Sequence, residues 1–96
     1  MRIIAKAALR EFWQQYPDAE DPLLAWFREV EREDWDHPAK VKDKYGNASF
    51  VGDRVVFNIG GNKYRLVVGI YYPHRIVYVR FVGTHAQYDR IKVEEV

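Results

Sequence analysis

Residues 57–65 read FNIGGNKYR and decide how the second half of the chain folds. Apolar residues alternate with other residues on both sides of Gly60-Gly61, which is the pattern of two strands joined by a turn. A two-residue loop at these glycines predicts an antiparallel hairpin with a defined register. Lys63 and Arg65 follow the turn, so the register also decides which side of the sheet carries positive charge.

The alternation continues on both sides of this hairpin, and a second two-residue turn is expected at Pro73-His74. In the resulting register, Arg54 lies opposite Val67, and Val67 lies opposite Arg80. One face of the predicted sheet then gathers four cations and two tyrosines: Arg54, Lys63, Arg65, Arg80, Tyr71 and Tyr78. The other face is apolar and contains Val55, Phe57, Leu66, Val68, Ile70, Val77, Val79 and Phe81. A one-residue shift at either turn would exchange the faces of a strand and break this separation.

The first half of the chain predicts two amphipathic helices that cover the apolar face. After a short strand at 2–4, apolar residues recur at helical spacing over 5–16, and Pro17 ends the run. Asp21 is expected to cap a second helix that has Pro22 at its first position. The predicted fold is α+β, with two N-terminal helices packed on one face of a small, mainly antiparallel sheet and a short C-terminal helix.

Composition limits the possible classes of protein. With 96 residues, the chain is expected to form a single domain over 1–96. A hydrophobic content of 48% and an aromatic content of 16% exclude a disordered chain. The absence of cysteine excludes disulfides and thiolate chemistry. Charges near the N-terminus and the lack of a long apolar stretch argue against a signal peptide or membrane contact, so the expected location is the cytoplasm.

Charge is distributed unevenly along the chain. Residues 1–53 contain eight Lys/Arg and eleven Asp/Glu, whereas residues 54–96 contain seven Lys/Arg and three Asp/Glu. The C-terminal half therefore predicts a basic surface.

The predicted cationic face has two interpretations. Arginines are common on the solvated side of an ordinary antiparallel sheet. Like charges at this spacing repel, however, unless an anion neutralises them, and arginine binds phosphate through a planar fork of donors. Tyr71 and Tyr78 add rings on which bases stack. This face is therefore a candidate for binding RNA through Arg54, Lys63, Tyr71 and Tyr78.

Residues 84–89 read THAQYD and predict a short helix at the rim of this face. Thr84 and Gln87 have the spacing of a capping box, and the free N–H groups of the first turn suit an anion. His85 and Tyr88 share one side of that turn, where imidazole could act as an acid or a base near neutral pH. A histidine that caps the helix and a tyrosine that packs in a corner are the alternatives, and Asp89 either orients one of them or is solvated.

Other kinds of site find no support in the sequence. The three histidines lack metal-ligand spacing, and the glycine pair lacks the lysine of a phosphate-binding loop. We expect neither a metal nor another cofactor.

Two long motifs resemble a known family. FNIGGNKYRL at 57–66, RFVGTH at 80–85, the following QYD at 87–89 and the spacing Trp35…Pro38…Lys42 are similar to HigB-type toxins of bacterial type II toxin–antitoxin systems. These toxins belong to the wider RelE-like group of messenger-RNA endonucleases. The resemblance covers nearly the whole chain and implies helices packed on a small antiparallel sheet.

The resemblance implies cleavage of messenger RNA, usually on the ribosome, without a metal. The 2′-hydroxyl of one nucleotide would attack the adjacent phosphorus, and the positions that match the family pattern are His85, Tyr88, Arg80 and Arg65. We expect His85 to be the acid or base with Tyr88 as its helper, and the two arginines to stabilise charge on the phosphate. The implied partner is a cognate helix-turn-helix antitoxin, and the toxin alone is expected to be monomeric. The alternatives are a non-catalytic RNA-binding module and a protein-interaction domain that uses the basic face.

Overall fold

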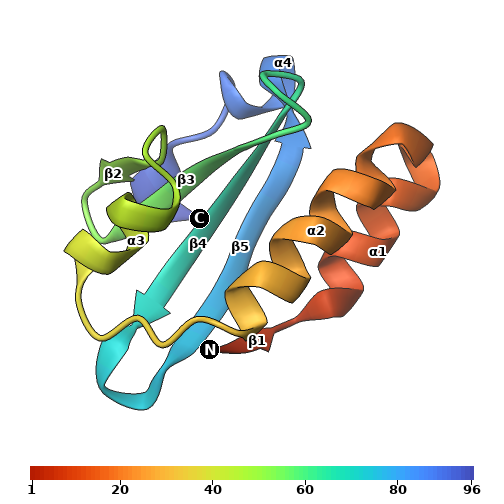
Figure 1. The fold of residues 1–96 in the computed structure, drawn as a ribbon. Helices are drawn as coiled ribbons and strands as arrows, with labels where there is room; N and C mark the ends of the chain where they lie inside the picture. Colours follow the sequence, from red (N-terminus) through yellow and green to blue (C-terminus); the bar gives the residue numbers. More distant parts are fainter.

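A five-stranded sheet forms the centre of the molecule, and helices cover one of its faces (Figure 1). The computed structural model describes all residues, 1–96. The strands are β1 (Arg2–Ile4), β2 (Ser49–Val51), β3 (Arg54–Ile59), β4 (Tyr64–Tyr71) and β5 (Ile76–Thr84). The helices are α1 (Lys6–Gln15), α2 (Glu20–Glu31), α3 (Pro38–Lys44) and α4 (His85–Tyr88), with 3₁₀ turns at Pro17–Ala19, Tyr72–His74 and Val93–Glu95.

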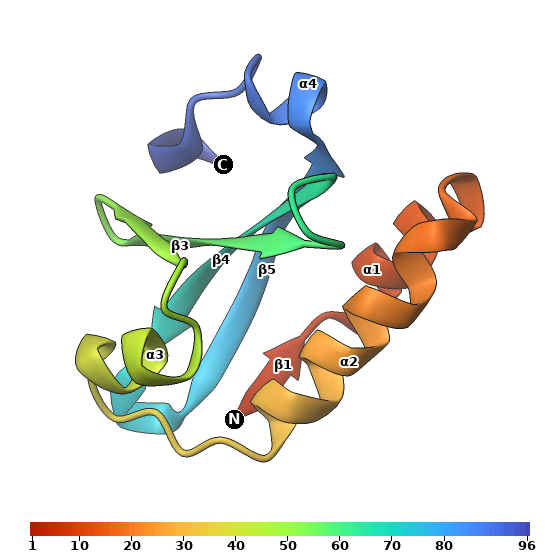
Figure 2. The same cartoon turned by 45° about the horizontal axis from the view of Figure 1, so that its top comes forward.

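The strand order is β1-β5-β4-β3-β2, and only β1 runs parallel to its neighbour. Figure 2 shows α1 and α2 side by side along one face of the sheet, with α3 near the opposite edge. The predicted α+β class, the two N-terminal helices and the short C-terminal helix are confirmed. None of the helices combines the length and the hydropathy needed to cross a lipid bilayer.

The apolar face of the sheet packs against these helices through aromatic rings. Phe57 lies 5.5 Å from Trp26 of α2 and 6.3 Å from Trp35 between ring centroids. Trp35 is only 1% exposed, although it lies in the loop between α2 and α3. Burying a side chain as large as Phe or Met contributes about 1.5–3 kcal/mol, so this cluster anchors the loop and α3 to the sheet. Five of the predicted apolar-face residues are fully buried: Val55, Phe57, Leu66, Val68 and Val77.

The predicted start of the second helix is wrong by two residues. Helix α2 begins at Glu20, directly after the 3₁₀ turn, and Ala19 takes the N-cap position without a side-chain cap. Pro22 is therefore the third helical residue. Proline is tolerated there because the first N–H groups of a helix have no partner within the helix. Ala19 is completely buried, so packing fixes this end in place of a capping side chain.

The loop between β3 and β4 is longer than predicted. Ile59 pairs with Tyr64, which leaves four residues in the turn, and both glycines have positive φ angles of 62° and 69°. Arg54 therefore lies opposite Gly69, not opposite Val67. This shift of two residues preserves which side chains share a face, because the side-chain period of a strand is two.

A β-bulge in β5 changes the predicted faces of two residues. Near the second turn the predicted pairing holds, since Gly69 lies opposite Tyr78 and Val68 opposite Val79. Beyond an irregularity at Val67/Val68, however, Val67 pairs with Phe81 in place of Arg80. The extra residue moves Phe81 off the apolar face, where the sequence analysis had placed it, and turns Val82 toward the core.

Candidate functional site

Three arginines share the sheet face that lies opposite the helices: Arg54 of β3, Arg65 of β4 and Arg80 of β5. Arg54 and Arg80 meet above Gly69, where a Cβ atom would lie 3.5 Å from Arg54 Nη1 and 3.7 Å from Arg80 Nε. Around them lies a shallow pocket of about 190 Å³, which we call the arginine pocket, lined by Asp53, Arg54, Gly69, Ile70, Tyr71, Tyr78 and Arg80. Four of the predicted site residues are thus brought together.

Within the arginine pocket, Arg54 is already committed to contacts inside the chain. Its Nε and Nη2 donate to the main-chain oxygen of Val96 at 3.0 and 2.7 Å, and its Nη1 donates to Asp53 Oδ1 at 3.1 Å. The side chain is only 17% exposed. Arg54 therefore holds the C-terminal segment against the sheet, and three of its five N–H donors are already occupied.

Arg80 is the available cation of the pocket. It is exposed, its guanidinium carbon lies 5.3 Å from the Tyr78 ring centroid, and the chain's ion pairs do not include it. Tyr71 is 50% exposed and stacks on His74 with ring centroids 5.1 Å apart. An exposed arginine beside two accessible rings suits a nucleic-acid strand, which offers phosphates and bases.

The second group of predicted residues lies at the far end of β5. Arg65 pairs with Gly83, two residues before His85. The His85 amide donates to the Lys63 carbonyl at 3.3 Å, which ties α4 to the β3–β4 turn. His85 Nδ1 lies 3.2 Å from Asp89 Oδ2, so the carboxylate fixes the orientation of the imidazole. Tyr88 is half-buried on the same helical turn.

Arg65 is also free of acidic partners. Its Nη1 donates to the carbonyls of Asn62 and Tyr64 at 3.1 and 3.3 Å, and the ion pairs of the chain do not involve it. Its guanidinium therefore lies at the β3–β4 turn, to which the His85 amide is also bonded, and its remaining donors are available there. We call Arg65, His85, Tyr88 and Asp89 the histidine cluster.

The two groups are separate places on one face. His85 follows Arg80 by five positions, so at about 3.3 Å per residue along β5 the Cα atoms of Arg80 and His85 are roughly 16 Å apart. The sequence analysis had assigned both Arg65 and Arg80 to the phosphate that reacts at His85. The structure instead places one free arginine at each end of the face.

Lys63 does not belong to the cationic face, contrary to the prediction. It lies in the β3–β4 turn, where its Nζ and the Tyr64 hydroxyl both donate to Asp18. The hydrogen bonds from Lys63 and Tyr64 lower the pKa of Asp18. This contact therefore stabilises the fold above about pH 4, the range of an unfolded aspartate, and is lost as the pH falls through the folded-state pKa.

The capping box of α4 is confirmed. The Gln87 amide donates to Thr84 Oγ1 at 3.2 Å, and the Thr84 amide donates to Gln87 Oε1 at 2.8 Å. Because α4 has only four residues, its dipole adds little attraction for an anion. The role of the capping box is to hold His85 in place.

Sequence reasoning missed two strand glycines and the C-terminal segment. Gly69 leaves space for two guanidinium groups, and Gly83 is buried under Phe81 and Gln87. A glycine inside a strand pattern is a recognised sign of a bulge or of a close approach, so both carried a signal. The contact of Val96 with Arg54 spans 42 residues, and no local pattern in the sequence signals it.

Gly83→Ala is expected to lower the free energy of unfolding by about 1–3 kcal/mol, the usual range for overpacking. The new Cβ would lie 2.5 Å from Phe81 Cζ and 2.8 Å from Gln87 Oε1, which forces apart the contacts that position α4. Urea denaturation measures the change. Gly46→Ala is the control, because its Cβ would meet nothing within 4 Å, and an equal loss in both variants would contradict the packing explanation.

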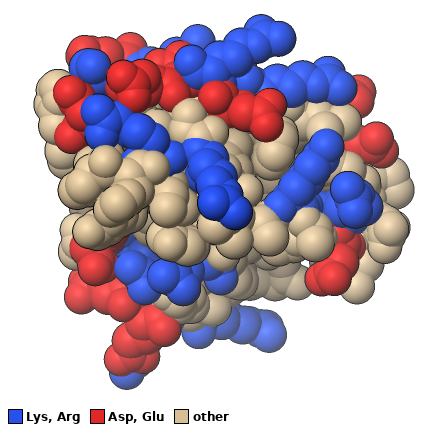
Figure 3. Space-filling view, turned by 90° about the horizontal axis from the view of Figure 1, so that it is seen from below, with Lys and Arg blue, Asp and Glu red and all other residues tan.

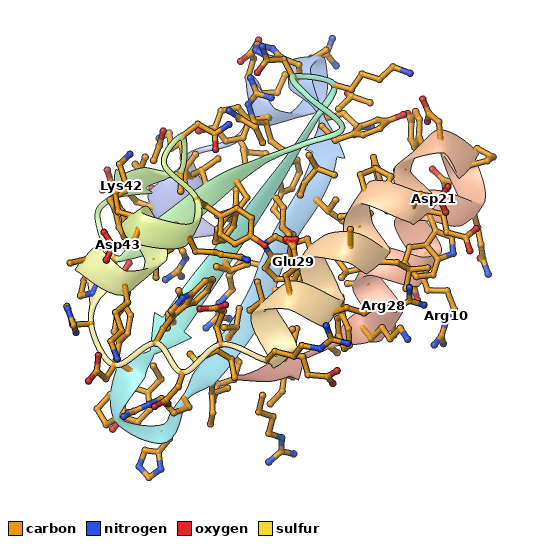
Figure 4. All side chains as sticks on the ribbon, in the orientation of Figure 1. Arg10, Asp21, Arg28, Glu29, Lys42 and Asp43 are labelled. Carbon is orange, nitrogen blue, oxygen red and sulfur yellow. The ribbon has the colours of Figure 1, made fainter.

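On the side of the molecule that carries the β4–β5 hairpin, charges do not form a comparable site. Figure 3, seen from the side of the β4–β5 hairpin, shows Lys/Arg and Asp/Glu side chains interleaved. Figure 4 shows Arg10 and Arg28 on the outer side of the helices, away from the sheet, and Glu29 on the inner side of α2. There, the Tyr45 hydroxyl donates to Glu29 at 3.3 Å. Burial is the main cause that raises the pKa of Tyr45, and the negative charge of Glu29 is the second. This tyrosine stays protonated and structural.

Comparison with known proteins identifies the family of this chain. Residues 19–91 match the family model of HigB_toxin, described as the RelE-like toxic component of a toxin–antitoxin system. The chain is 28% identical over 92 residues to the mRNA interferase toxin HigB of Escherichia coli K12, which covers 93% of this chain and 88% of that protein. It is 27% identical over 94 residues to the mRNA interferase HigB of Escherichia coli O6:H1, covering 95% and 91%. The matched region contains the arginine pocket and the histidine cluster, and the chain belongs to the HigB family of RelE-like toxic components of toxin–antitoxin systems.

Proposed function

We propose that this protein is an endoribonuclease that cleaves messenger RNA, in the cytoplasm and on the ribosome, as the toxin of a type II toxin–antitoxin pair. Its relatives carry the name mRNA interferase. The observation that carries the proposal is the histidine cluster. An oriented imidazole and an arginine without an acidic partner lie at the same end of the sheet.

A metal-free cleavage of RNA requires a base, an acid and a cation, and we assign these roles to the histidine cluster. The 2′-oxygen attacks the adjacent phosphorus, its proton passes to a base, and the bond from phosphorus to the 5′-oxygen breaks as that oxygen receives a proton from an acid. The products are a 2′,3′-cyclic phosphate and a 5′-hydroxyl. His85 serves as the acid or base with Tyr88 as its helper, and Arg65 stabilises the charge that develops on the phosphate oxygens.

The arginine pocket has a different role in this proposal. At roughly 16 Å from His85 along the strand, Arg80 binds a neighbouring phosphate of the same RNA and does not reach the scissile one. Tyr71 and Tyr78 offer rings for unpaired bases. Arg54 lines the pocket beside Arg80 and is held in place by its bonds to Val96. In this assignment the catalytic arginine is Arg65, and Arg80 is an RNA-binding residue.

Mapping of transcript 5′ ends after induced expression tests the proposal. We expect new 5′-hydroxyl ends within messages when the wild-type protein is expressed, and none with His85→Ala. A matched message without a start codon serves to test dependence on the ribosome, because only the translated copy should be cut. Crosslinking to RNA without new ends would instead support a non-catalytic RNA-binding module, and the absence of both would favour a protein-interaction domain.

The proposed partner is a helix-turn-helix antitoxin encoded beside the toxin gene, and the free toxin is a monomer. The family is described as the toxic component of a toxin–antitoxin system, which supports the existence of an antitoxin partner.

A further inference from the structure

The largest cavity of the molecule lies outside both groups of site residues. It is a groove of about 490 Å³ between α1, β5 and the segment that follows α4, lined by Ala8, Glu11, Phe12, Gln15, Tyr16, Phe81, Val82, Gln87, Arg90 and Ile91. The contributions from α1 recur three and four residues apart, so one side of that helix forms a continuous wall. We call this cavity the β5 groove.

The β5 groove runs along an open edge of the sheet. Strand β1 pairs only with residues 76–78, and its last residue, Ile4, lies opposite Tyr78. Strand β5 continues to Thr84 with no strand on that side (Figure 1). An unpaired edge exposes main-chain N–H and C=O groups, which are a ready template for an added strand. The groove therefore offers hydrogen bonds to an extended backbone.

The side chains of the groove suit an apolar occupant. Phe12 and Tyr16 stack with ring centroids 4.7 Å apart, and the bulge turns Phe81 away from the apolar face of the sheet. The charged groups are one acid, Glu11, and one base, Arg90. RNA would need a cluster of cations, which this groove lacks. A second copy of the chain would have to bring its own edge, flanked by its own helices, between these walls, so a single extended segment fits better.

We propose that the β5 groove receives an extended, apolar segment of the antitoxin, which adds a strand to the open edge of β5. The inference rests on the proposed function for the identity of the partner. Main-chain hydrogen bonds to β5 would supply affinity, and side chains seated between α1 and Ile91 would supply specificity. The occupant would also touch Gln87, whose side chain holds the first turn of α4 and thereby His85.

Two neighbouring alanines of α1 provide a matched test. Ala8 lines the groove, whereas Ala7 is exposed and lies outside it. Ala8→Glu and Ala7→Glu introduce the same charge into the same helix, but only the first places it against an apolar segment. With purified toxin and the antitoxin encoded beside its gene, we expect Ala8→Glu to weaken binding roughly 10- to 100-fold by calorimetry. Ala7→Glu should bind as the wild type does.

Hydrogen exchange then tests the mode of binding. Amides on the open edge of residues 79–83 should become protected in the wild-type complex. Equal affinity of the two variants, or no added protection at this edge, would overturn the inference. So would a wild-type toxin that is dimeric when free and becomes monomeric with Ala8→Glu, since the occupant would then be a second copy. Cleavage by free Ala8→Glu is measured separately, so failure of the proposed nuclease activity would remain distinguishable.

Discussion

Arg65→Ala is expected to lower kcat for RNA cleavage by about 10²- to 10³-fold, the usual effect of removing one group that stabilises a developing oxyanion. Arg80→Ala is expected to act mainly on KM and to reduce kcat/KM about 10- to 100-fold, as the loss of one charged hydrogen bond to a remote phosphate would. The two arginines share a face but lie at opposite ends of it, beside Gly83 and Gly69 respectively. Steady-state kinetics on a defined RNA would separate the two effects.

Stability measurements are needed to interpret these variants. Arg65 donates to two turn carbonyls, so its removal should also lower the free energy of unfolding by about 1 kcal/mol. Arg80 donates no hydrogen bond within the chain and should be nearly neutral. Arg10→Ala controls for the loss of a positive charge, because Arg10 lies on the outer side of the helices (Figure 4). If Arg65→Ala and Arg80→Ala gave the same change in kcat, the division into two subsites would be wrong.

The same face illustrates what the sequence could and could not predict. The error in the first turn was harmless for Arg54 and Arg65, because a shift of two residues leaves every side chain on its face. The error in β5 was not harmless. One extra residue in the strand exchanged the faces of Phe81 and Val82, and that changed the floor of the β5 groove. Alternation in the sequence predicts which face of a sheet a side chain occupies only as far as the first β-bulge in the strand.

Long-range contacts account for the remaining differences. Lys63 was assigned to the cationic face because its position in a strand was inferred from local alternation. Its partner Asp18 is 45 residues away, and Arg54 meets Val96 across 42 residues. Local patterns identify strands, helices and the capping box at Thr84, because those depend on neighbours in sequence. They do not reveal which cation already has an acceptor, and that information decides which arginines are free for RNA.

His85→Ala is expected to reduce cleavage by about 10²- to 10⁴-fold, the range for loss of a positioned acid or base. The fold should be unaffected, because the His85 side chain is exposed and its polar partner, the Asp89 carboxylate, is exposed as well. Cleavage and thermal unfolding would be measured on the same preparation. Tyr88→Phe is the companion variant, since it removes the hydroxyl that would assist His85 while retaining the ring that packs in α4.

Added imidazole distinguishes proton transfer from a merely structural role of His85. Free imidazole can enter the space left by His85→Ala, because the site lies on an exposed helical turn, and it should restore part of the lost rate in a concentration-dependent manner. The same addition should leave Arg65→Ala unchanged, because imidazole does not replace a guanidinium that stabilises the phosphate. A His85→Ala variant with full activity would remove the acid–base assignment. A variant that is inactive, folded and not rescued would point instead to a role of His85 in binding RNA.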